Sequence, residues 1–187
     1  MEYIPKNILD VGGNDGVRSR LAYPNDKITV IDKKYGWDIK DRGLPYGDWD
    51  IILVNHLIEH LDDPDQFLRD VKKVMTKNTI LEISTPNLCA WFNRVLFLFG
   101  WLPHSYEVSY EHNVGKCFGW NNERVGGHLR VFSVRALIEL LGKHGFKILD
   151  VRGEPSTYPC HAVIKTIDKV LSRWAPFASA FRVRCHV

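Results

Sequence analysis

Residues 8–16 read ILDVGGNDG, and this stretch decides the fold. A short, mostly apolar run, Ile8–Val11, leads directly into a loop with three glycines, and a segment that can start a helix follows at Val17–Ala22. Glycines suit such a loop because the chain turns tightly there and a ligand must reach backbone N–H groups. A buried strand, a glycine loop and a helix in this order predict an α/β protein with a ligand site at the end of its first strand.

Strand-like and helix-like segments alternate along the remaining chain. The apolar run Asp50–Val54 is continuous, which suits a parallel sheet covered on both faces. Asp63 and Pro64 form a good helix start, and Ser133 and Gly145 bracket another helix. The sequence therefore predicts a doubly wound, mostly parallel sheet with helices on both faces. The expected strands are Ile8–Val11, Lys27–Ile31, a very short one near Trp37–Ile39, Asp50–Val54, Thr79–Ile83, Phe146–Val151 and Ala180–Val187, and further helices are expected at Leu88–Phe99 and Ala162–Trp174.

Length and composition limit the class of protein to which the chain can belong. The chain has 187 residues, which predicts one domain spanning 1–187, and 45% hydrophobic with 25% charged residues is typical of a soluble globular protein. The formal net charge of +3 gives no reason to expect a nucleic-acid partner. The four cysteines include no Cys-x-x-Cys pair and no signal peptide is visible, so a reducing, cytoplasmic setting is expected.

Acidic residues accompany the glycine loop. The glycines are spaced G-G-x-x-G, which differs from the dinucleotide fingerprint G-x-G-x-x-G. Asp10 would oppose a pyrophosphate anion but suits a ligand that carries an ammonium group. Asp32 ends the second expected strand, where a carboxylate can accept hydrogen bonds from both hydroxyls of a ribose. Because ligands bind at the carboxyl ends of parallel strands, Asn55–His60 is a third candidate segment.

These residues resemble the class I S-adenosylmethionine-dependent methyltransferases, in particular their small type 11 and type 23 domains. The family's first motif is D/E-x-G-x-G-x-G; Asp10, Gly12 and Gly16 match it, and Asn14 stands in place of the middle glycine. Asn tolerates a positive φ better than most residues, so the turn can still form. Asp32 matches the family's ribose-binding acid.

Further motifs follow in the family's order. Asp38, ahead of the Gly-Leu-Pro at 43–45, resembles the segment that contacts the adenine ring. Residues 49–61 resemble the family's FDvv…leHl stretch, and Gly127–Ser133 resembles its GHlr.fs stretch. Each motif alone is weak, but their order is specific, and the resemblance covers most of residues 8–153.

The resemblance implies a Rossmann-like fold with an antiparallel last strand, S-adenosylmethionine as cofactor, and direct transfer of its methyl group to an oxygen or nitrogen atom. The acceptor is not identified by the sequence; an apolar or lipid-like small molecule is one candidate class. A non-catalytic S-adenosylmethionine-binding protein is an alternative that the same residues allow. The residues expected to contact the cofactor are Asp10, Gly12, Gly13, Asn14, Gly16, Asp32, Asp38 and Asn55.

The segment His56–His60 reads HLIEH and also matches the H-x-x-E-H motif of inverted zincins. On a helix, His56 and His60 would share a face and bind zinc, with Glu59 beside the bound water, as in a zinc hydrolase. The segment is a short connection between a strand and a capped helix, however, and no third ligand is evident. We therefore expect no metal site, and we expect Glu59 and His60 to organise the loop by hydrogen bonds.

The catalytic base and the acceptor site are expected outside the glycine loop. His128 is the first candidate for the base, since it lies between an aromatic segment and a helix; a structural histidine is the alternative. Residues 88–127 lie where this family places substrate-recognition insertions and are expected to form a lid. The apolar stretch 88–102 is interrupted by Asn93 and Arg94 and is too short to span a bilayer, but it suits an acceptor or a peripheral membrane contact. Core packing or a dimer contact is the alternative, and the oligomeric state cannot be read.

Overall fold

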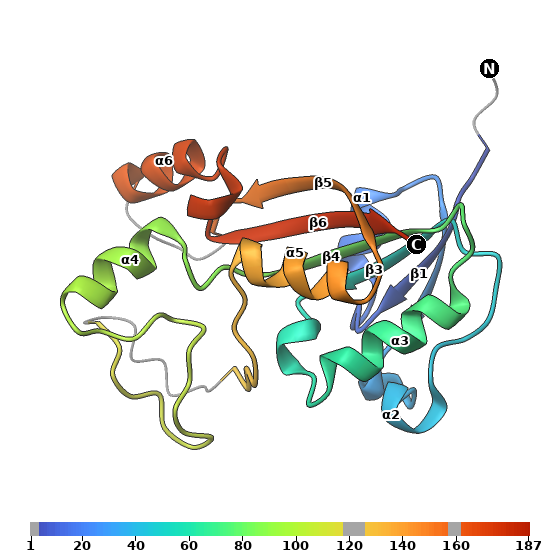
Figure 1. The fold of residues 1–187 in the computed structure, drawn as a ribbon, viewed down its shortest axis with the longest axis horizontal. Helices are drawn as coiled ribbons and strands as arrows, with labels where there is room; N and C mark the ends of the chain where they lie inside the picture. The colour runs from blue at the N-terminus through green and yellow to red at the C-terminus, as the bar shows by residue number, and fades with distance from the viewer. Residues whose placement is uncertain (1–3, 118–125, 157–161) are drawn as a thin grey trace.

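The computed structural model describes residues 4–117, 126–156 and 162–187 (Figure 1). Its strands form one six-stranded sheet with the order β2-β1-β3-β4-β6-β5. Neighbouring strands from β2 to β4 are parallel, and β6 is antiparallel to both β4 and β5, so the predicted antiparallel last strand is confirmed. The strands are β1 Asn7–Val11, β2 Lys27–Ile31, β3 Ile51–Asn55, β4 Ile80–Pro86, β5 Lys147–Glu154 and β6 Ala180–His186.

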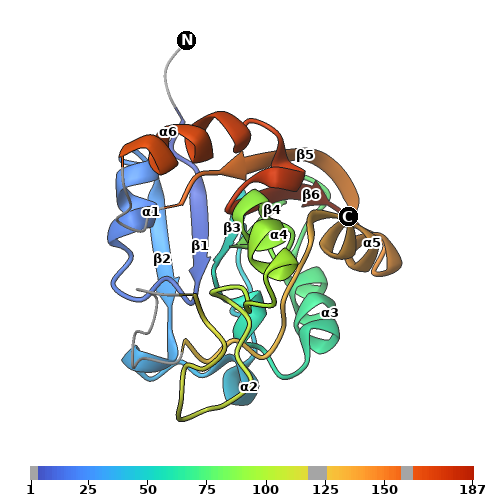
Figure 2. The same ribbon diagram turned by 90° about the vertical axis from the view of Figure 1, so that its left-hand side faces the viewer.

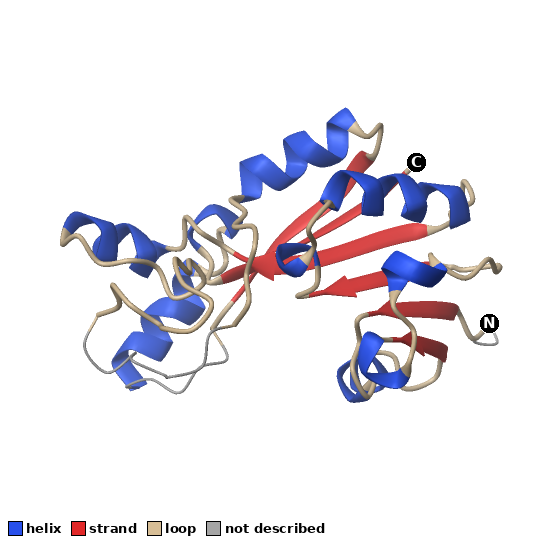
Figure 3. Ribbon diagram, turned by 90° about the horizontal axis from the view of Figure 1, so that it is seen from below, coloured by secondary structure: helices blue, strands red, loops and turns tan. Residues whose placement is uncertain are grey.

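Helices lie on both faces of the sheet, which confirms the doubly wound, Rossmann-like architecture. Figure 2 shows α1 on one side and α3 with α5 on the other, and Figure 3 shows the strands between helices from below. The main core lies under α3 and α5, where Leu68 and Leu137 are fully buried in one cluster with Leu9, Val54 and Ile83. The helices are α1 Val17–Ala22, α2 Ile39–Arg42, α3 Pro64–Val74, α4 Trp91–Leu98, α5 Val134–Lys143 and α6 Ala162–Leu171, with 3-10 turns η1 Lys33–Tyr35, η2 Ile58–His60 and η3 Ala175–Phe177.

Local signals fix the starts of the two core helices. Asp63 accepts the Gln66 N–H at 2.8 Å at the start of α3, and Pro64 occupies the first helical position. Ser133 accepts the Ala136 N–H at 3.1 Å at the start of α5. Both predicted helix starts are confirmed, and each cap satisfies a backbone N–H that has no partner within its own helix.

The short strand predicted near Trp37–Ile39 is wrong. Asp38 instead caps α2, because its side chain accepts the Lys40 N–H at 3.0 Å. An aspartate that bonds its own backbone two residues ahead favours a turn or helix start over a strand. The segment between β2 and β3 therefore folds as η1 and α2.

α4 and α6 lie together beyond the carboxyl ends of β4 and β5, at the left of Figure 1. The indole N–H of Trp91 on α4 donates to Asp168 Oδ1 on α6 at 2.8 Å. The guanidinium of Arg94 lies 4.6 Å from the centroid of the Phe177 ring. Within the described parts of the chain, no helix combines the length and apolar character needed to cross a membrane.

Candidate functional site

Three loops meet at the carboxyl edge of the sheet. β1 lies between β2 and β3, and Val11 is in register with both Ile31 and Val54. The loops that follow these strands therefore leave the sheet side by side, where parallel sheets bind ligands. The Gly12 N–H donates to the Ile31 carbonyl at 2.8 Å, which holds the first loop against the second strand.

The glycine loop uses left-handed backbone at three positions. Gly12, Asn14 and Gly16 have φ angles of 72°, 52° and 71°. Residues other than Gly, Asn and Asp seldom adopt this conformation. Asn14 therefore provides the backbone geometry of the glycine that it replaces in the motif, as its tolerance of positive φ predicts.

The loop also lies too close to its neighbours for larger side chains. A Cβ atom added to Gly13 would lie 2.1 Å from Asp10 Oδ2, and one added to Gly16 would lie 2.6 Å from Val30 Cγ2. Both distances are far below van der Waals contact, which for carbon atoms begins at about 3.5 Å. A larger residue at either position would therefore force its neighbours to shift.

Asp10 is buried beneath the loop, with 2% of its surface exposed. Its Oδ1 atom has no hydrogen-bond partner among the described residues. Burial raises the pKa of Asp10; the Ser19 hydroxyl opposes this shift, and the Asp32 charge adds to it. A buried carboxylate oxygen without a partner is costly, and a cationic ligand group would offset that cost. The position suits the ammonium group of an amino-acid ligand.

Asp32 joins the first and second loops. Its Oδ2 accepts the Asn14 N–H at 2.9 Å, and its Oδ1 accepts the Lys34 N–H at 2.8 Å. A carboxylate offers about four acceptor positions, so each oxygen can still accept a hydrogen bond from a ribose hydroxyl. The Lys34 ammonium lies 3.2 Å from Asn14 Oδ1 and strengthens the same junction.

Asp38 and Asn55 differ in what surrounds them: Asp38 bonds to its own segment, and Asn55 lies at the end of a strand. Asp38 is held by its own segment: the Lys40 N–H and the Lys33 ammonium, 3.0 Å away, lower the pKa of its carboxyl. Asn55 ends β3 in register with Ser84, whose hydroxyl donates to Asn55 Oδ1 at 3.1 Å. Asn55 therefore lies at the same edge as the glycine loop, whereas Asp38 lies between β2 and β3, at the start of α2.

A cavity of about 440 Å³ lies beside these loops. Its lining includes Arg18 of α1 and His56 after β3, together with Phe92 of α4 and Ser156 on the chain that leads from β5 towards α6. Pockets of several hundred Å³ bind small molecules. The cavity thus extends from Arg18 and the loop after β3 to α4 and the approach to α6.

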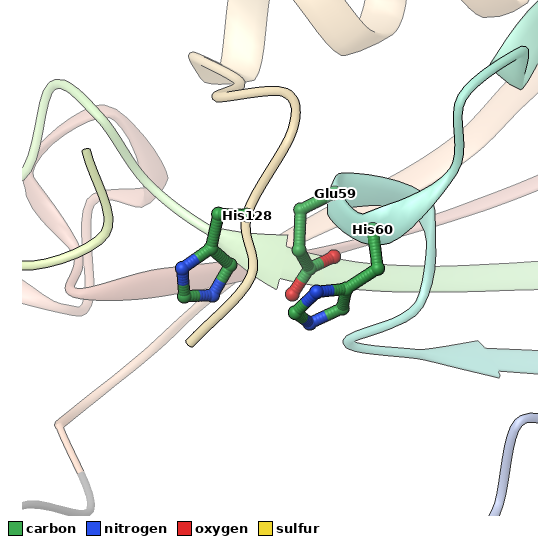
Figure 4. A group of neighbouring side chains, drawn as sticks. All are labelled: Glu59, His60 and His128. Carbon is green, nitrogen blue, oxygen red and sulfur yellow. The ribbon is translucent and has the colours of Figure 1, made fainter. Parts of the chain in front are cut away.

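Glu59, His60 and His128 gather in this cavity and point toward one another (Figure 4). The imidazole rings of His60 and His128 are stacked, with centroids 4.8 Å apart and planes 23° apart. Glu59 is 1% exposed, and its Oε2 accepts the Thr85 hydroxyl at 2.9 Å. Two segments supply the group: Glu59 and His60 lie on η2, and His128 lies ahead of α5.

Backbone hydrogen bonds hold these two segments together. The Glu59 carbonyl accepts the Leu129 N–H at 2.8 Å and the Arg130 N–H at 3.0 Å. The Glu107 carboxylate accepts three successive N–H groups, those of residues 126–128, at 2.6, 2.7 and 3.1 Å. Burial opposes ionisation of Glu107, but these N–H groups outweigh it and lower the pKa. The position of His128 is therefore fixed from both sides.

Burial favours the neutral form of two histidines in this cavity. It lowers the pKa of His128, and the neighbouring His60 lowers this pKa further. It also lowers the pKa of His104, with the charge of Lys116 adding to the shift. A neutral imidazole keeps a lone pair that can accept a proton or bind a metal ion.

The HLIEH segment does not form the helix that an inverted zincin needs. Ile58–His60 is a single 3-10 turn, and His56 before it has a φ of 50°. The zinc-hydrolase alternative, which needs His56 and His60 on one helix face, is therefore wrong in its geometry. His60 does make a hydrogen bond of the predicted kind, since its Nδ1 lies 3.0 Å from the Gly127 carbonyl oxygen.

α4 and α6 turn polar side chains inward and apolar side chains outward. Asn93 on α4 is buried and donates to the Asn87 carbonyl at 2.9 Å. Asp168 on α6 is buried and accepts the Ser179 hydroxyl at 2.6 Å as well as the indole N–H of Trp91. Core packing is thus wrong for much of α4. The exposed apolar residues on and just after the two helices are together called the α4–α6 apolar surface. Its members are the exposed Val95, Phe97, Leu98, Phe99, Val163, Ile164, Ile167, Val170 and Trp174.

Sequence reasoning missed several polar residues that hold this region. Lys116 is 4% exposed, and its ammonium donates to the backbone carbonyls of Pro103, His104 and Tyr106. Burial lowers the pKa of this ammonium. A polar residue inside an apolar helix, such as Asp168, is a usable signal, whereas no local pattern marks Lys116 or Glu107. Residues 118–125 of the lid predicted at 88–127 lie outside the described residues.

Residues 4–151 match a family model described as "Methyltransferase domain". The chain therefore belongs to this family and is an S-adenosylmethionine-dependent methyltransferase. The glycine loop, Asn14 at positive φ and the unpaired Asp10 oxygen fit that cofactor.

Solved structures share the fold. An S-adenosylmethionine-dependent methyltransferase from Archaeoglobus fulgidus is 14% identical, with a TM-score of 0.58 over 98% of this chain and 86% of that one. A second from Mesorhizobium loti is 13% identical, with a TM-score of 0.56 over 98% and 91% of the two chains. No protein among those of curated function matches the sequence.

Proposed function

We propose that the protein methylates an oxygen or nitrogen atom of an apolar or lipid-like small molecule. The observation that carries this proposal is the cavity, which extends from Arg18 of α1 and the loop after β3 to α4 and the approach to α6. Both helices expose apolar faces at that end of the molecule. An acceptor with a long apolar part can therefore reach the cavity from the same side.

We assign the cofactor to the loops after β1, β2 and β3. In this assignment Asp10 pairs with the ammonium group, Asp32 holds the ribose, and the backbone of Gly12–Gly16 follows the cofactor closely. Asn55 contributes from the edge of β3, and Asp38 from the start of α2 toward the adenine. The bound cofactor supplies an electrophilic methyl group on a sulfonium, and the residues of the chain align an acceptor for in-line attack.

The acceptor must lose a proton when its oxygen or nitrogen gains the methyl group. His128 is our candidate for the residue that accepts it, because it is half-buried in the cavity and favours the neutral form. Its Nδ1 lies 3.4 Å from Glu107 Oε1, so Nδ1 carries the ring proton and Nε2 keeps the lone pair. General bases of this kind contribute about 10²–10⁴-fold to rates.

We further propose that the α4–α6 apolar surface rests on a lipid membrane, in a cell compartment such as the cytoplasm. Lys165, Lys169 and Arg173 are exposed on or just after α6, close to the apolar residues of that surface. Cations beside an exposed apolar face suit anionic phospholipids. In this view the described residues of the predicted lid, 88–117 and 126–127, cover the acceptor site.

The test follows S-adenosylhomocysteine formation with acceptors that differ only in apolar length, such as 4-alkylphenols and 1-alkylamines from methyl to dodecyl. Turnover is expected to rise with chain length, since each buried methylene contributes about 0.8 kcal/mol. Faster turnover of the shortest members would contradict an apolar acceptor. The His128→Ala variant is expected to lose at least about tenfold in kcat at unchanged cofactor affinity.

A further inference from the structure

We infer that Glu59, His60 and His128 form a binding site for one divalent transition-metal ion. One carboxylate oxygen of Glu59 and one nitrogen from each imidazole lie within 4.8 Å of one another. Figure 4 shows the three side chains converging from η2 and from the segment ahead of α5. All three line the 440 Å³ cavity, so a bound ion has open positions for water or an acceptor.

The hydrogen bonds of both imidazoles prepare a metal-binding nitrogen. His60 Nδ1 lies 3.0 Å from the Gly127 carbonyl oxygen, and a carbonyl can only accept. His128 Nδ1 lies 3.4 Å from the carboxylate of Glu107, which likewise accepts. Each Nδ1 therefore carries the ring proton, and each Nε2 keeps its lone pair. An Nδ1–H bonded to a carbonyl or carboxylate is the usual support of a metal-ligating histidine.

One carboxylate oxygen of Glu59 is available to bind a metal ion. Thr85 occupies Oε2, but Oε1 is buried and accepts no well-aligned hydrogen bond among the described residues. His56 Nδ1 lies 3.3 Å from this oxygen. His56 is 40% exposed at its side chain, so it can turn away without being left unsolvated. A cation would satisfy Oε1 and offset the cost of burying it.

The geometry needs only a small closure. Ligand atoms bound to one ion at about 2.1 Å lie about 3–4 Å apart, so the three side chains must rotate to bring their ligand atoms closer together. The backbone bonds from Leu129 and Arg130 to the Glu59 carbonyl hold the two segments in place. Two imidazoles and a carboxylate suit Zn²⁺, Co²⁺, Mn²⁺ or Fe²⁺ better than Mg²⁺ or Ca²⁺, which prefer oxygen ligands alone.

An ion here would act on the acceptor, a consequence that rests on the proposed function. A hydroxyl bound to a divalent ion loses its proton to solvent near neutral pH. Its oxygen then forms the bond to the methyl carbon while the carbon–sulfur bond breaks and the sulfur keeps the electron pair. His128 serves as a ligand in this form of the enzyme and does not also act as the base.

The experiment titrates chelator-treated full-length protein with Co²⁺ and follows its visible absorption, with Zn²⁺ affinity measured by calorimetry. One equivalent is expected to bind, and His60→Ala and His128→Ala are each expected to weaken affinity at least about 100-fold. Glu59→Gln tests the carboxylate, and His112→Ala is the matched control because His112 is 74% exposed and distant in sequence. Metal affinity of the two histidine variants equal to that of the unchanged protein, or no specific Co²⁺ spectrum, would overturn the site.

Binding of S-adenosylhomocysteine serves as the fold check for every variant. Measurable binding is expected for every variant, because Asp10 and Asp32, which are assigned to the ammonium group and the ribose, are unchanged. Metal binding without any cofactor binding would sink the proposed function and leave the metal site standing. Cofactor binding and turnover in metal-free protein that takes up no ion would overturn the metal site and leave the proposed function standing.

Discussion

The two halves of the carboxyl edge of the sheet are built differently. On the cofactor side, adjacent loops make the contacts, as when the Asn14 N–H reaches Asp32, 18 residues away. On the acceptor side, contacts join distant segments, as between His60 and Gly127, 67 residues apart, and between Trp91 and Asp168, 77 apart. The first half therefore depends on turn chemistry, and the second depends on the packing of the whole chain.

The same contrast extends to burial. The cofactor side buries a carboxylate, Asp10, beneath backbone that only small residues can form. The acceptor side buries Asn93 and Asp168 and leaves Phe97 and Leu98 in solvent, at 50% and 82% exposure. The tightly packed backbone on the cofactor side suits a ligand of fixed shape. The exposed apolar side chains on the acceptor side suit a partner that binds reversibly.

Gly13→Ala is expected to have the largest effect, because the new Cβ would lie 2.1 Å from Asp10 Oδ2. The loop must shift, so affinity for S-adenosylhomocysteine should fall at least about 100-fold and stability by about 1–3 kcal/mol. Calorimetry and thermal unfolding measure both. Gly142→Ala on α5 is the matched control, since nothing lies within 4 Å of its Cβ and alanine favours helix. Intact binding by Gly13→Ala would contradict the tight loop.

Asp168→Ala tests the other half. It removes the acceptor for the Trp91 indole, the Ser179 hydroxyl and the Ser156 N–H, and leaves these groups without that partner. Unfolding free energy should fall by about 2–4 kcal/mol, with cofactor affinity within twofold. Chemical denaturation measures the first and calorimetry the second. A matching loss of cofactor affinity would show that the two halves are not separable as described.

The double substitution Phe97→Ser with Leu98→Ser should leave stability within about 0.5 kcal/mol, because both side chains are exposed. Binding to anionic phosphatidylserine vesicles should fall several-fold, as measured by co-sedimentation. Leu21→Ser on α1, 78% exposed, is the control for loss of an apolar residue elsewhere. The surface would instead be a dimer contact if two results were found together. The unchanged protein would self-associate and the double variant would not, and neither protein would bind vesicles.

The smallest effect concerns thiol reactivity. Burial raises the pKa of Cys185 on β6 to about 12, so almost none of it is thiolate at about pH 8. Because the raised pKa favours the protonated form, Cys185 should resist iodoacetamide until the protein unfolds. Cys89 and Cys117 on the acceptor side are partly exposed and should react in the native state. Peptide mass spectrometry locates the label, and native labelling of Cys185 would contradict the packed core.

Sequence reasoning predicted the start of α3 and the turn of the glycine loop well, because these signals are local. The helix start at Asp63 and the tolerance of Asn14 for positive φ both follow from the chemistry of single residues. It failed near Trp37–Ile39, where Asp38 prefers to bond its own backbone. The roles assigned to the cofactor residues remain predictions.

The acceptor half was harder to predict for a physical reason. Periodicity identifies an apolar face on α4 but cannot say whether that face turns to the sheet or to solvent. The pairing of His128 with His60 depends on how the chain returns from the lid, which no local pattern encodes. The proximity of Glu59, His60 and His128 therefore became visible only in the folded structure.

The most direct test of the central claim is calorimetric titration of the folded, chelator-treated protein with S-adenosylhomocysteine, beside Asp32→Ala and the exposed control Asp48→Ala. Micromolar binding is predicted, weakened at least about tenfold by Asp32→Ala through lost hydrogen bonds to the ribose and to the loop, and unchanged by Asp48→Ala. No binding by the folded protein, or equal binding by the Asp32→Ala variant, would contradict the assignment of the glycine loop and Asp32 to the cofactor.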